Sequence, residues 1–277
     1  MMTRMNNPGN LNGTVPLFFG VSPKRLYGCH HIPQGMNTRT CGVVLCPPLG
    51  QEYIQSHRVI YQFAVRLSRV GFHVLRFDYF GCGDSEGDCE QGEFSQWIED
   101  IHAAIGELNN RSGLKSVCLI GLRIGATLSL EAADNFHNIC GMVLWEPILD
   151  GRVYLMELDK RQRQQQFFLN KIHGKRRLPL ARSETDVEVL GFPLTPGLRR
   201  DLEKVKMDLS KLPYHSKSLI VSNSKNSKFV RELRTYTQDN PRIDFQIMDD
   251  RMAWEDARII PIKTVGYLVD WMEKAFS

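Results

Sequence analysis

The stretch LIGLRIGATLSL, residues 119–130, is the feature that most constrains how this chain folds. An apolar run typical of a β-strand ends at Gly121, and an apolar run with helical character follows Gly125. The two glycines permit a cramped turn from strand to helix, with Arg123 at its centre. A strand that passes into a helix in this way is typical of parallel α/β proteins.

Strand-like and helix-like segments alternate on both sides of this turn. The strand-like segments are residues 41–48, 72–80, 116–122, 139–147, 218–224 and 242–248. The helical ones are residues 57–71 and 94–108, the run that follows Gly125, and residues 228–237 and 265–276. Alternation at this spacing implies right-handed βαβ units. We therefore predict an α/β fold with a mostly parallel central sheet flanked by helices.

One long segment interrupts the alternation. Residues 151–213 are polar and rich in glutamine and basic side chains, with helical character and no clear strand. We predict that residues 1–150 form the N-terminal part of the core, residues 151–213 a basic helical cap inserted into it, and residues 214–277 the C-terminal part of the core.

The composition excludes several classes of protein. With 277 residues, 42% hydrophobic and 24% charged, the chain has an ordinary globular composition, and its net charge of +4 gives little support for nucleic-acid binding. It contains neither an uninterrupted apolar stretch of transmembrane length nor a signal-peptide core. The seven cysteines include no C-x-x-C pair, and the histidines lack metal-ligand spacing. We expect a cytoplasmic protein with no cofactor, metal, nucleic-acid or membrane partner.

Five stretches carry a resemblance to a known family. They are LCPPLGQEYIQSHR, GFHVLRFDYFGCGDSEGD, LIGLRIGAT, LWEPILDGRVYLMEL and VLGFPLTPGLRRDL, which together span residues 45–203. With them, the chain resembles the serine-aminopeptidase-like group of α/β-hydrolases, close to uncharacterised hydrolases associated with exosortase and natural-product gene clusters. The resemblance implies an α/β-hydrolase fold and a catalytic Ser, Asp or Glu, and His triad in that chain order.

The residues at the three implied triad positions do not fit that activity. The nucleophile position holds Arg123, whose guanidinium stays protonated and cannot attack a carbonyl. The loop after the strand 218–222 contains no carboxylate, although Glu146 follows the preceding strand, where the acid of this fold can also lie. The last histidine of the chain, His215, precedes the loop that would hold the base. Ordinary triad hydrolysis is therefore not expected.

An arginine at a helix N-terminus adds a full charge where backbone N–H groups already favour anions. Arg123 is either neutralised by Glu52, Asp78 or Glu146, or open to an anionic ligand, and we favour the ion pair, with Glu52 as its first partner. Glu52 itself is either such a partner or a base, or a solvated acid in the first turn of a helix. We assign Arg123, Glu52 and Glu146 as the candidate catalytic residues.

Further residues are expected to surround a ligand in the same cleft. Leu49 and Gly50 stand where this fold builds its oxyanion hole from backbone N–H groups. Trp254 either forms a wall of the pocket or is a partly buried aromatic residue. The full set of candidate ligand-binding residues is Leu49, Gly50, Tyr53, Asp78, Ile124, Trp254 and Glu255.

The inserted segment suggests a kind of partner. Residues 160–182 contain eight lysines and arginines and no acidic residue. Such a surface attracts acidic partners, and an acyl carrier protein, coenzyme A or a carboxylated metabolite would each fit. The alternative is an ordinary solvated face.

Two functions from different classes follow. In the first, the protein lacks the triad and binds an acyl or carboxylate ligand, or an acyl-loaded carrier, in the hydrolase cleft without turnover. In the second, it is a hydrolase, thioesterase, acyltransferase or lyase that acts on an acyl ester or thioester through Glu52, Glu146 or Cys46.

Overall fold

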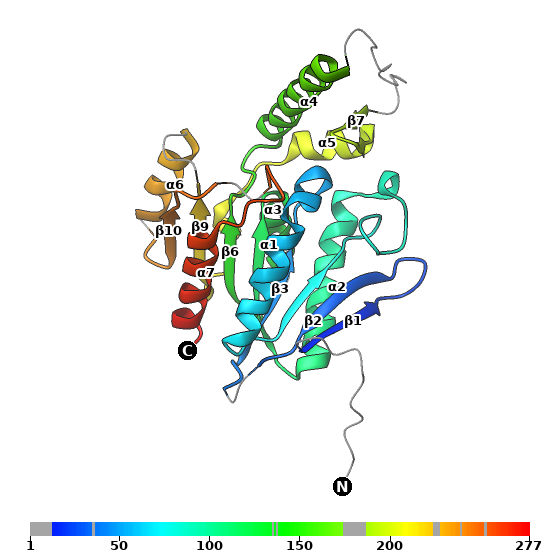
Figure 1. Cartoon of the computed structure of the whole chain (residues 1–277). Coiled ribbons are helices and arrows are strands. Elements are labelled where there is room, and N and C mark those ends of the chain that lie inside the picture. The colour runs from blue at the N-terminus through cyan, green and yellow to red at the C-terminus, as the bar shows by residue number, and fades with distance from the viewer. Residues whose placement is uncertain are drawn as a thin grey trace.

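The computed structural model describes residues 13–34, 37–134, 136, 138–173, 187–223, 228–238, 240–251 and 254–277. A central sheet of eight strands has the order β1-β2-β4-β3-β5-β6-β9-β10. Pairing is parallel from β4 to β10, and antiparallel between β1 and β2 and between β2 and β4. The predicted mostly parallel sheet with flanking helices is confirmed (Figure 1).

The strands are β1 (Thr14–Phe19), β2 (Leu26–His31), β3 (Cys41–Cys46), β4 (Val74–Phe77), β5 (Ser116–Leu122), β6 (Ile139–Trp145), β7 (Val187–Val189), β8 (Phe192–Leu194), β9 (Lys217–Ser222) and β10 (Ile243–Ile247). The α-helices are α1 (Gly50–Arg69), α2 (Phe94–Ser112), α3 (Ile124–Ala133), α4 (Gly151–His173), α5 (Pro196–Lys204), α6 (Lys228–Gln238) and α7 (Ile262–Ala275). Short 3₁₀ helices η2 (Cys89–Gln91) and η3 (Leu209–Lys211) complete the described elements.

Helices cover both faces of the sheet because successive residues of each strand point to opposite sides. In β3, Val43 and Leu45 pack with α1 and α7, whereas Val44 and Cys46 pack with α2 and α3. The central strands are buried on both faces, as expected of a parallel sheet. This burial makes the sheet a rigid base for the loops at its carboxyl edge.

The structure differs from the sequence-based expectations in three places. An antiparallel hairpin, β1 and β2, precedes the first expected strand and extends the sheet beyond β4. Helix α1 begins at Gly50, directly after the β3 loop, rather than near residue 57. The segment 151–213, expected to have no strand, contains the small antiparallel pair of β7 and β8.

The inserted segment 151–213 lies over the carboxyl edge of the sheet (Figure 1). Helix α4 projects beyond the core, and α5 and the β7–β8 hairpin lie beside its base. The last part of the basic run, including Lys175, Arg176, Arg177 and Arg182, lies outside the described residues. No helix in the described ranges is long and apolar enough to cross a membrane.

Candidate functional site

The turn between β5 and α3 places Arg123 at the carboxyl edge of the sheet. Arg123 adopts φ 56° and ψ −123°, a backbone conformation that a non-glycine residue enters only at a cost of about 1 kcal/mol or more. Its amide donates to the Trp145 carbonyl at 2.9 Å, and its carbonyl accepts from Ala126 at 3.0 Å. These bonds tie the turn to β6 and to its own helix.

The two flanking glycines are required by close backbone contacts. A Cβ at Gly121 would lie 2.5 Å from the Ala126 nitrogen, and a Cβ at Gly125 would lie 2.3 Å from the Cys46 carbonyl oxygen. Real Cβ atoms do not approach backbone so closely. The turn can form only with glycine at both positions.

Two carboxylates bind the Arg123 side chain, which is buried. Its Nε donates to Glu52 Oε1 at 3.1 Å, and its Nη2 donates to Glu157 Oε2 at 2.8 Å. Burial acts to lower the pKa of Arg123, but these carboxylates outweigh it, so the pKa lies above its ordinary value. The expected ion pair with Glu52 is present, and Glu157 of α4 is a second partner that was not predicted.

A second arginine from α4 joins the same carboxylates. Arg161 Nη1 donates to Glu52 Oε1 at 3.1 Å, and Arg161 Nη2 lies 3.0 Å from Glu157 Oε1. Arg161 Nη2 also lies 3.5 Å from Glu255 Oε1. We call Arg123, Arg161, Glu52 and Glu157 the charge cluster. Its two positive and two negative side chains balance, and it joins α4 to the core.

Aromatic residues enclose the charge cluster. Tyr154 of α4 donates its hydroxyl to Glu52 Oε2 at 3.1 Å. The guanidinium carbon of Arg123 lies 5.5 Å from the Tyr154 ring centre and 5.3 Å from that of Trp254, within cation–π range. Trp254 is only 1% exposed and packs edge-on against Trp145. Trp254 therefore forms one wall beside the buried guanidinium of Arg123.

Glu52 is also buried, at 1% exposure, rather than a solvated acid. Three donors, from Arg123, Arg161 and Tyr154, satisfy its carboxylate. A buried carboxylate is tolerated when it is paired and hydrogen-bonded in this way. The arrangement leaves Glu52 little freedom to take a proton from a ligand.

Glu146 has a separate environment at the end of β6. It is buried, with φ 47°, and it accepts hydrogen bonds from the Ser222 hydroxyl at 2.9 Å and from the backbone amide of Asn223. Burial raises the pKa of Glu146 above its ordinary value, although these donors and Arg123 act to lower it. Of the loop after β9, residues 224–227 lie outside the described part of the chain.

Three other residues that were expected to act in the site have surroundings that do not fit that role. Asp78 accepts a 2.6 Å hydrogen bond from the Tyr53 hydroxyl and a 3.1 Å bond from the Asp84 amide, so its carboxylate is bound by its own loop and by α1. Ile124 is completely buried in the core below the turn. Cys46 is 1% exposed, and burial raises the pKa of its thiol, which opposes a role as nucleophile.

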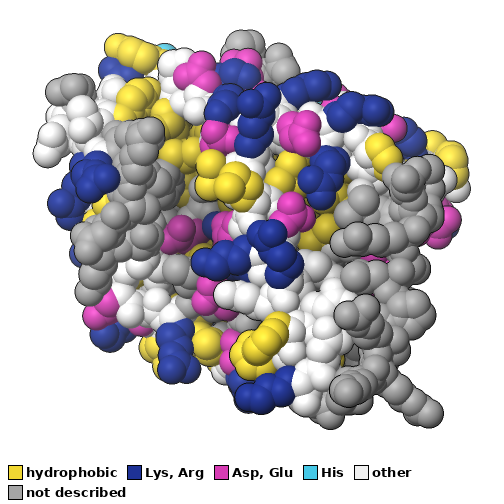
Figure 2. Space-filling view, turned by 90° about the horizontal axis from the view of Figure 1, so that it is seen from above, with side chains coloured by type: hydrophobic (Ala, Val, Ile, Leu, Met, Phe, Trp, Pro, Cys, Tyr) yellow, Lys and Arg dark blue, Asp and Glu magenta, His cyan; other side chains and the backbone are white. Residues whose placement is uncertain are grey.

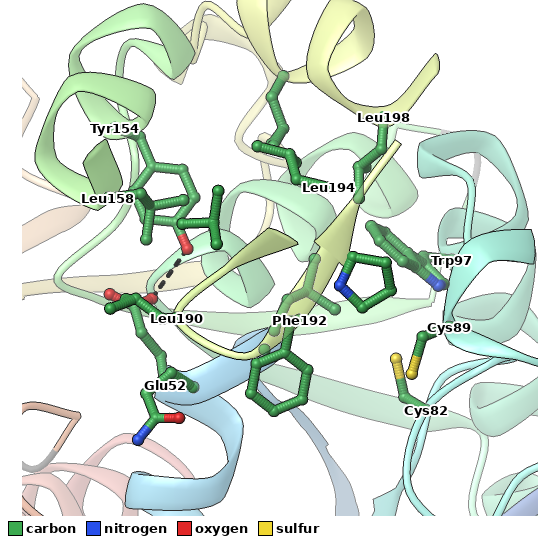
Figure 3. A pocket seen from close by; sticks show the side chains of 16 residues that line it. Glu52, Cys82, Cys89, Trp97, Tyr154, Leu158, Leu190, Phe192, Leu194 and Leu198 are labelled. Atoms are coloured by element: carbon green, nitrogen blue, oxygen red, sulfur yellow. Dashed lines mark hydrogen bonds between the residues drawn. The ribbon is translucent and has the colours of Figure 1, made fainter. Parts of the chain in front are cut away.

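An apolar cavity of about 80 Å³ adjoins the charge cluster, and we call it the apolar cavity (Figure 3). Leu49, Gly50 and Glu52 border it from the start of α1, and Tyr154 and Leu158 border it from α4. Trp97, Cys82, Cys89 and the β7–β8 hairpin residues complete most of its wall. The Glu52 carboxylate and the Tyr154 hydroxyl are bonded to each other at one side (Figure 3).

Five of the described histidines either contact residues outside the charge cluster or lie at the opposite edge of the sheet. His215 precedes β9 and therefore lies at the amino edge of the sheet, opposite the β5–α3 turn. His30 contacts His73, and His31 contacts Arg76 and Thr14, on the β1–β2 side. His57 contacts Tyr53, with its ring centre 5.9 Å away. None of these contacts reaches the charge cluster.

The fold is that of a known family. The family model for serine aminopeptidases of the S33 group matches residues 51–240. The chain belongs to this family of α/β-hydrolases. A search of curated protein sequences gives no significant match to this family member.

Solved structures share the fold at low sequence identity. The protein Est1E from Butyrivibrio proteoclasticus, with ferulic acid bound, is 13% identical, with TM-score 0.68 over 94% of this chain and 98% of its own. An esterase of Pyrococcus furiosus is 14% identical, with TM-score 0.63 over 95% and 91%. A serine hydrolase without a lid from Xanthomonas campestris is 13% identical, with TM-score 0.57 over 97% and 96%. At these identities the likeness concerns the fold alone.

The α4 residues that were not predicted do carry a signal in the sequence. Tyr154, Glu157 and Arg161 are spaced three and four residues apart, so they lie on one face of α4. That spacing marks a polar face directed at the core. Arg161 is easily overlooked because it also belongs to the basic run of residues 160–182.

Proposed function

We propose that this family member binds an acyl ligand in the apolar cavity and does not act as a triad hydrolase. The observation that carries the proposal is Arg123 at the strand-to-helix turn, held by both Glu52 and Glu157. A guanidinium cannot serve as the nucleophile. The balanced charge cluster also favours an acyl group over a free carboxylate, because a carboxylate would have to displace Glu52 or Glu157.

The walls of the cavity support an acyl ligand. The residues that face it are mostly leucines and aromatic side chains, with the Glu52–Tyr154 pair at one side. Ligand sites commonly combine an apolar lining with a few fixed polar groups. Leu49 and Gly50, at the start of α1, adjoin the cavity and would face the carbonyl end of such a ligand.

A test is isothermal titration calorimetry with S-hexanoyl-N-acetylcysteamine, a simple acyl thioester, with hexanoic acid release followed in parallel. We expect saturable binding without release of acid. Leu158→Trp, which fills the cavity from α4, should abolish binding, whereas Met156→Trp on the exposed side of the same helix should not. Equal binding by the Leu158→Trp variant would overturn the proposed location.

A turnover function through Glu146 is the second candidate. A buried acid with a raised pKa and a strained backbone is a feature of catalytic sites. Glu146 could then act as a general acid or base on an acyl ester or thioester. Release of hexanoic acid by the wild type, lost in Glu146→Gln, would support this alternative.

We also propose an acidic acyl carrier protein as a cytoplasmic partner, in line with the resemblance to hydrolases of natural-product clusters. Lys160, Arg163 and Lys171 are exposed on α4. Seen from above, however, lysines and arginines alternate with carboxylates over this face (Figure 2). Charge reversal at Lys160 and Arg163 should weaken binding of an acyl-loaded carrier at low salt, and unchanged binding would exclude this surface.

A further inference from the structure

A second, polar cleft of about 490 Å³ borders the β7–β8 turn at Leu190, and we call it the glutamine cleft. Its walls are Gln51 and Gln55 of α1, Arg161, Gln164 and Gln165 of α4, and Glu255. Gln51 and Leu190 border both spaces, so the two adjoin each other. A ligand in the apolar cavity that extended past Leu190 would enter the glutamine cleft.

The charges of the glutamine cleft are already paired. Arg161 contacts Glu52, Glu157 and Glu255, and Arg123 behind it contacts Glu52 and Glu157. A free carboxylate would therefore have to break an existing ion pair to find a cation. Charge alone gives an anionic head group no advantage in this cleft.

The side-chain amides of the glutamine cleft are available to a ligand. Across the described ranges of the chain, the amides of Gln51, Gln55, Gln164 and Gln165 make no hydrogen bond. A glutamine amide both donates and accepts hydrogen bonds. The complementary head group is uncharged and also donates and accepts, as a carboxamide does.

The size of the apolar cavity limits the acyl chain. A single water molecule needs a cavity volume of roughly 10–15 Å³. The apolar cavity, at about 80 Å³, therefore holds roughly five to eight groups of that size. A short chain fills this space, and a long-chain fatty acyl group exceeds it.

Leu190 holds the boundary between the two spaces in an unfavourable backbone conformation. It has φ 55° in the turn between β7 and β8, and it is 9% exposed. Its amide donates to Gln162 Oε1 of α4 at 2.6 Å, which fixes the turn against the helix. The branched side chain of Leu190 is therefore held at the point where the acyl chain of a ligand would join its head group.

We infer that the ligand is a short acyl chain joined to an uncharged, amide-like head, with the chain in the apolar cavity and the head in the glutamine cleft. The inference rests on the proposed acyl-binding function and adds the length of the chain and the chemistry of the head. It assigns the role of head-group contact to the glutamine amides and not to Arg123.

The test compares two ligands that differ only in the terminal group. Calorimetry on the whole protein measures the binding of N-hexanoylglycinamide and N-hexanoylglycine, with N-acetylglycinamide and N-hexadecanoylglycinamide as probes of chain length. We expect N-hexanoylglycinamide to bind at least about tenfold more tightly than the carboxylate, because the carboxylate cannot donate and finds no free cation among the described residues of the cleft. The acetyl and hexadecanoyl compounds should both bind more weakly.

A variant pair tests the glutamine contact. Gln164→Ala should weaken N-hexanoylglycinamide binding roughly three- to tenfold, the effect of one lost hydrogen bond. Gln166→Ala is the matched control, because two residues further along α4 the side chain lies on the opposite side of the helix and does not border the cleft. Equal losses in the two variants would overturn the assignment of the head group.

The other outcomes separate this inference from the proposed function. If N-hexanoylglycine binds as tightly as the amide, and Leu158→Trp abolishes both, the acyl cavity stands and the neutral head is wrong. If the hexadecanoyl compound binds best, the inferred chain length is wrong. If neither hexanoyl compound binds but S-hexanoyl-N-acetylcysteamine does, the inference fails and the proposed acyl-binding function stands. If none of the three binds, both fail.

Discussion

Arg123 Nε and Glu52 Oε1 lie 3.1 Å apart, so the strand-to-helix turn of β5 and α3 is joined to the first turn of α1 by a buried ion pair. Both side chains are largely withdrawn from solvent, with exposed fractions of 7% and 1%. In an α/β-hydrolase, this turn presents the nucleophile to the cleft. In this chain the same turn holds α4 against the core, because Glu157 and Arg161 complete the charge cluster.

Removal of the Arg123 charge should destabilise the fold. Arg123→Met leaves Glu52 buried with one donor fewer and Glu157 without its 2.8 Å partner, and we expect a loss of about 3 kcal/mol in the free energy of unfolding. Urea denaturation measures this loss, with the exposed Arg58→Met as control. In a double-mutant cycle, Arg123→Met with Glu52→Gln should cost less than the two single changes together. Strict additivity would contradict a direct interaction.

A serine at position 123 should not create a hydrolase. Arg123→Ser, combined with Glu157→Gln to keep the charge balance, supplies a hydroxyl at the turn but no histidine at the position of the base. The last histidine of the chain, His215, lies at the opposite edge of the sheet. We expect no labelling by a fluorophosphonate probe and no ester hydrolysis above background. Stoichiometric labelling of the new serine would show that another group activates it.

The charge cluster should control how firmly α4 is held. Glu157→Gln weakens the contacts to Arg123 and Arg161, and we expect faster amide hydrogen exchange in residues 151–173, with exchange in β3, β5 and β6 unchanged. Asp159→Asn on the same helix is the control, because its contact with Arg199 is 3.6 Å long and partly exposed. If exchange increases equally in both variants, the loss of any carboxylate on α4 explains the effect, and the contacts of Glu157 within the charge cluster do not.

Two buried histidines should make the fold sensitive to acid. Burial, with His73 nearby, lowers the pKa of His30 to about 4, and burial, with Arg76 nearby, lowers the pKa of His31 to about 3. In the folded protein both pKa values lie below the ordinary value of 6.5. The stability that the two neutral histidines contribute is therefore present above about pH 6.5 and is lost as the pH falls towards 4 and 3.

The variant His31→Gln separates this effect from other titrations. Glutamine can accept from Arg76 and donate to Thr14, as His31 does, but it does not titrate. When the pH falls from 7 to 5, the free energy of unfolding of the wild type should decrease by about 2 kcal/mol more than that of His31→Gln. Equal decreases in the two proteins, measured by urea denaturation, would exclude His31 as the source of the acid sensitivity.

Local patterns predicted much of the fold and part of the site. The β5–α3 turn was predictable because Gly121 and Gly125 flank it and because both of its neighbours are apolar runs. Glu52 was predictable as a partner because the loop after β3 opens at the same edge of the sheet. These inferences depend only on short-range sequence and on the parallel topology.

The remaining contacts depend on packing between distant segments. Glu157 reaches Arg123, and Arg161 reaches Glu52, only because the inserted segment places α4 over the carboxyl edge of the sheet. A basic run gives no sign of this placement. Asp78 was expected to be available to Arg123, but local turn chemistry places the Asp84 amide and the Tyr53 hydroxyl on its carboxylate. The strands β7 and β8 have only three residues each, which is too short for a clear periodicity.

The most direct test of the central claim is mass spectrometry of the purified protein after incubation with a panel of acyl thioesters and simple esters. Arg123→Ala, Glu52→Ala and Glu146→Gln are incubated alongside. If the protein binds acyl ligands without triad chemistry, no free acid is released, no residue is acylated, and short-chain compounds bind saturably. Released acid or an acylated residue in the wild type, lost in one variant, would contradict this account and identify the reacting group.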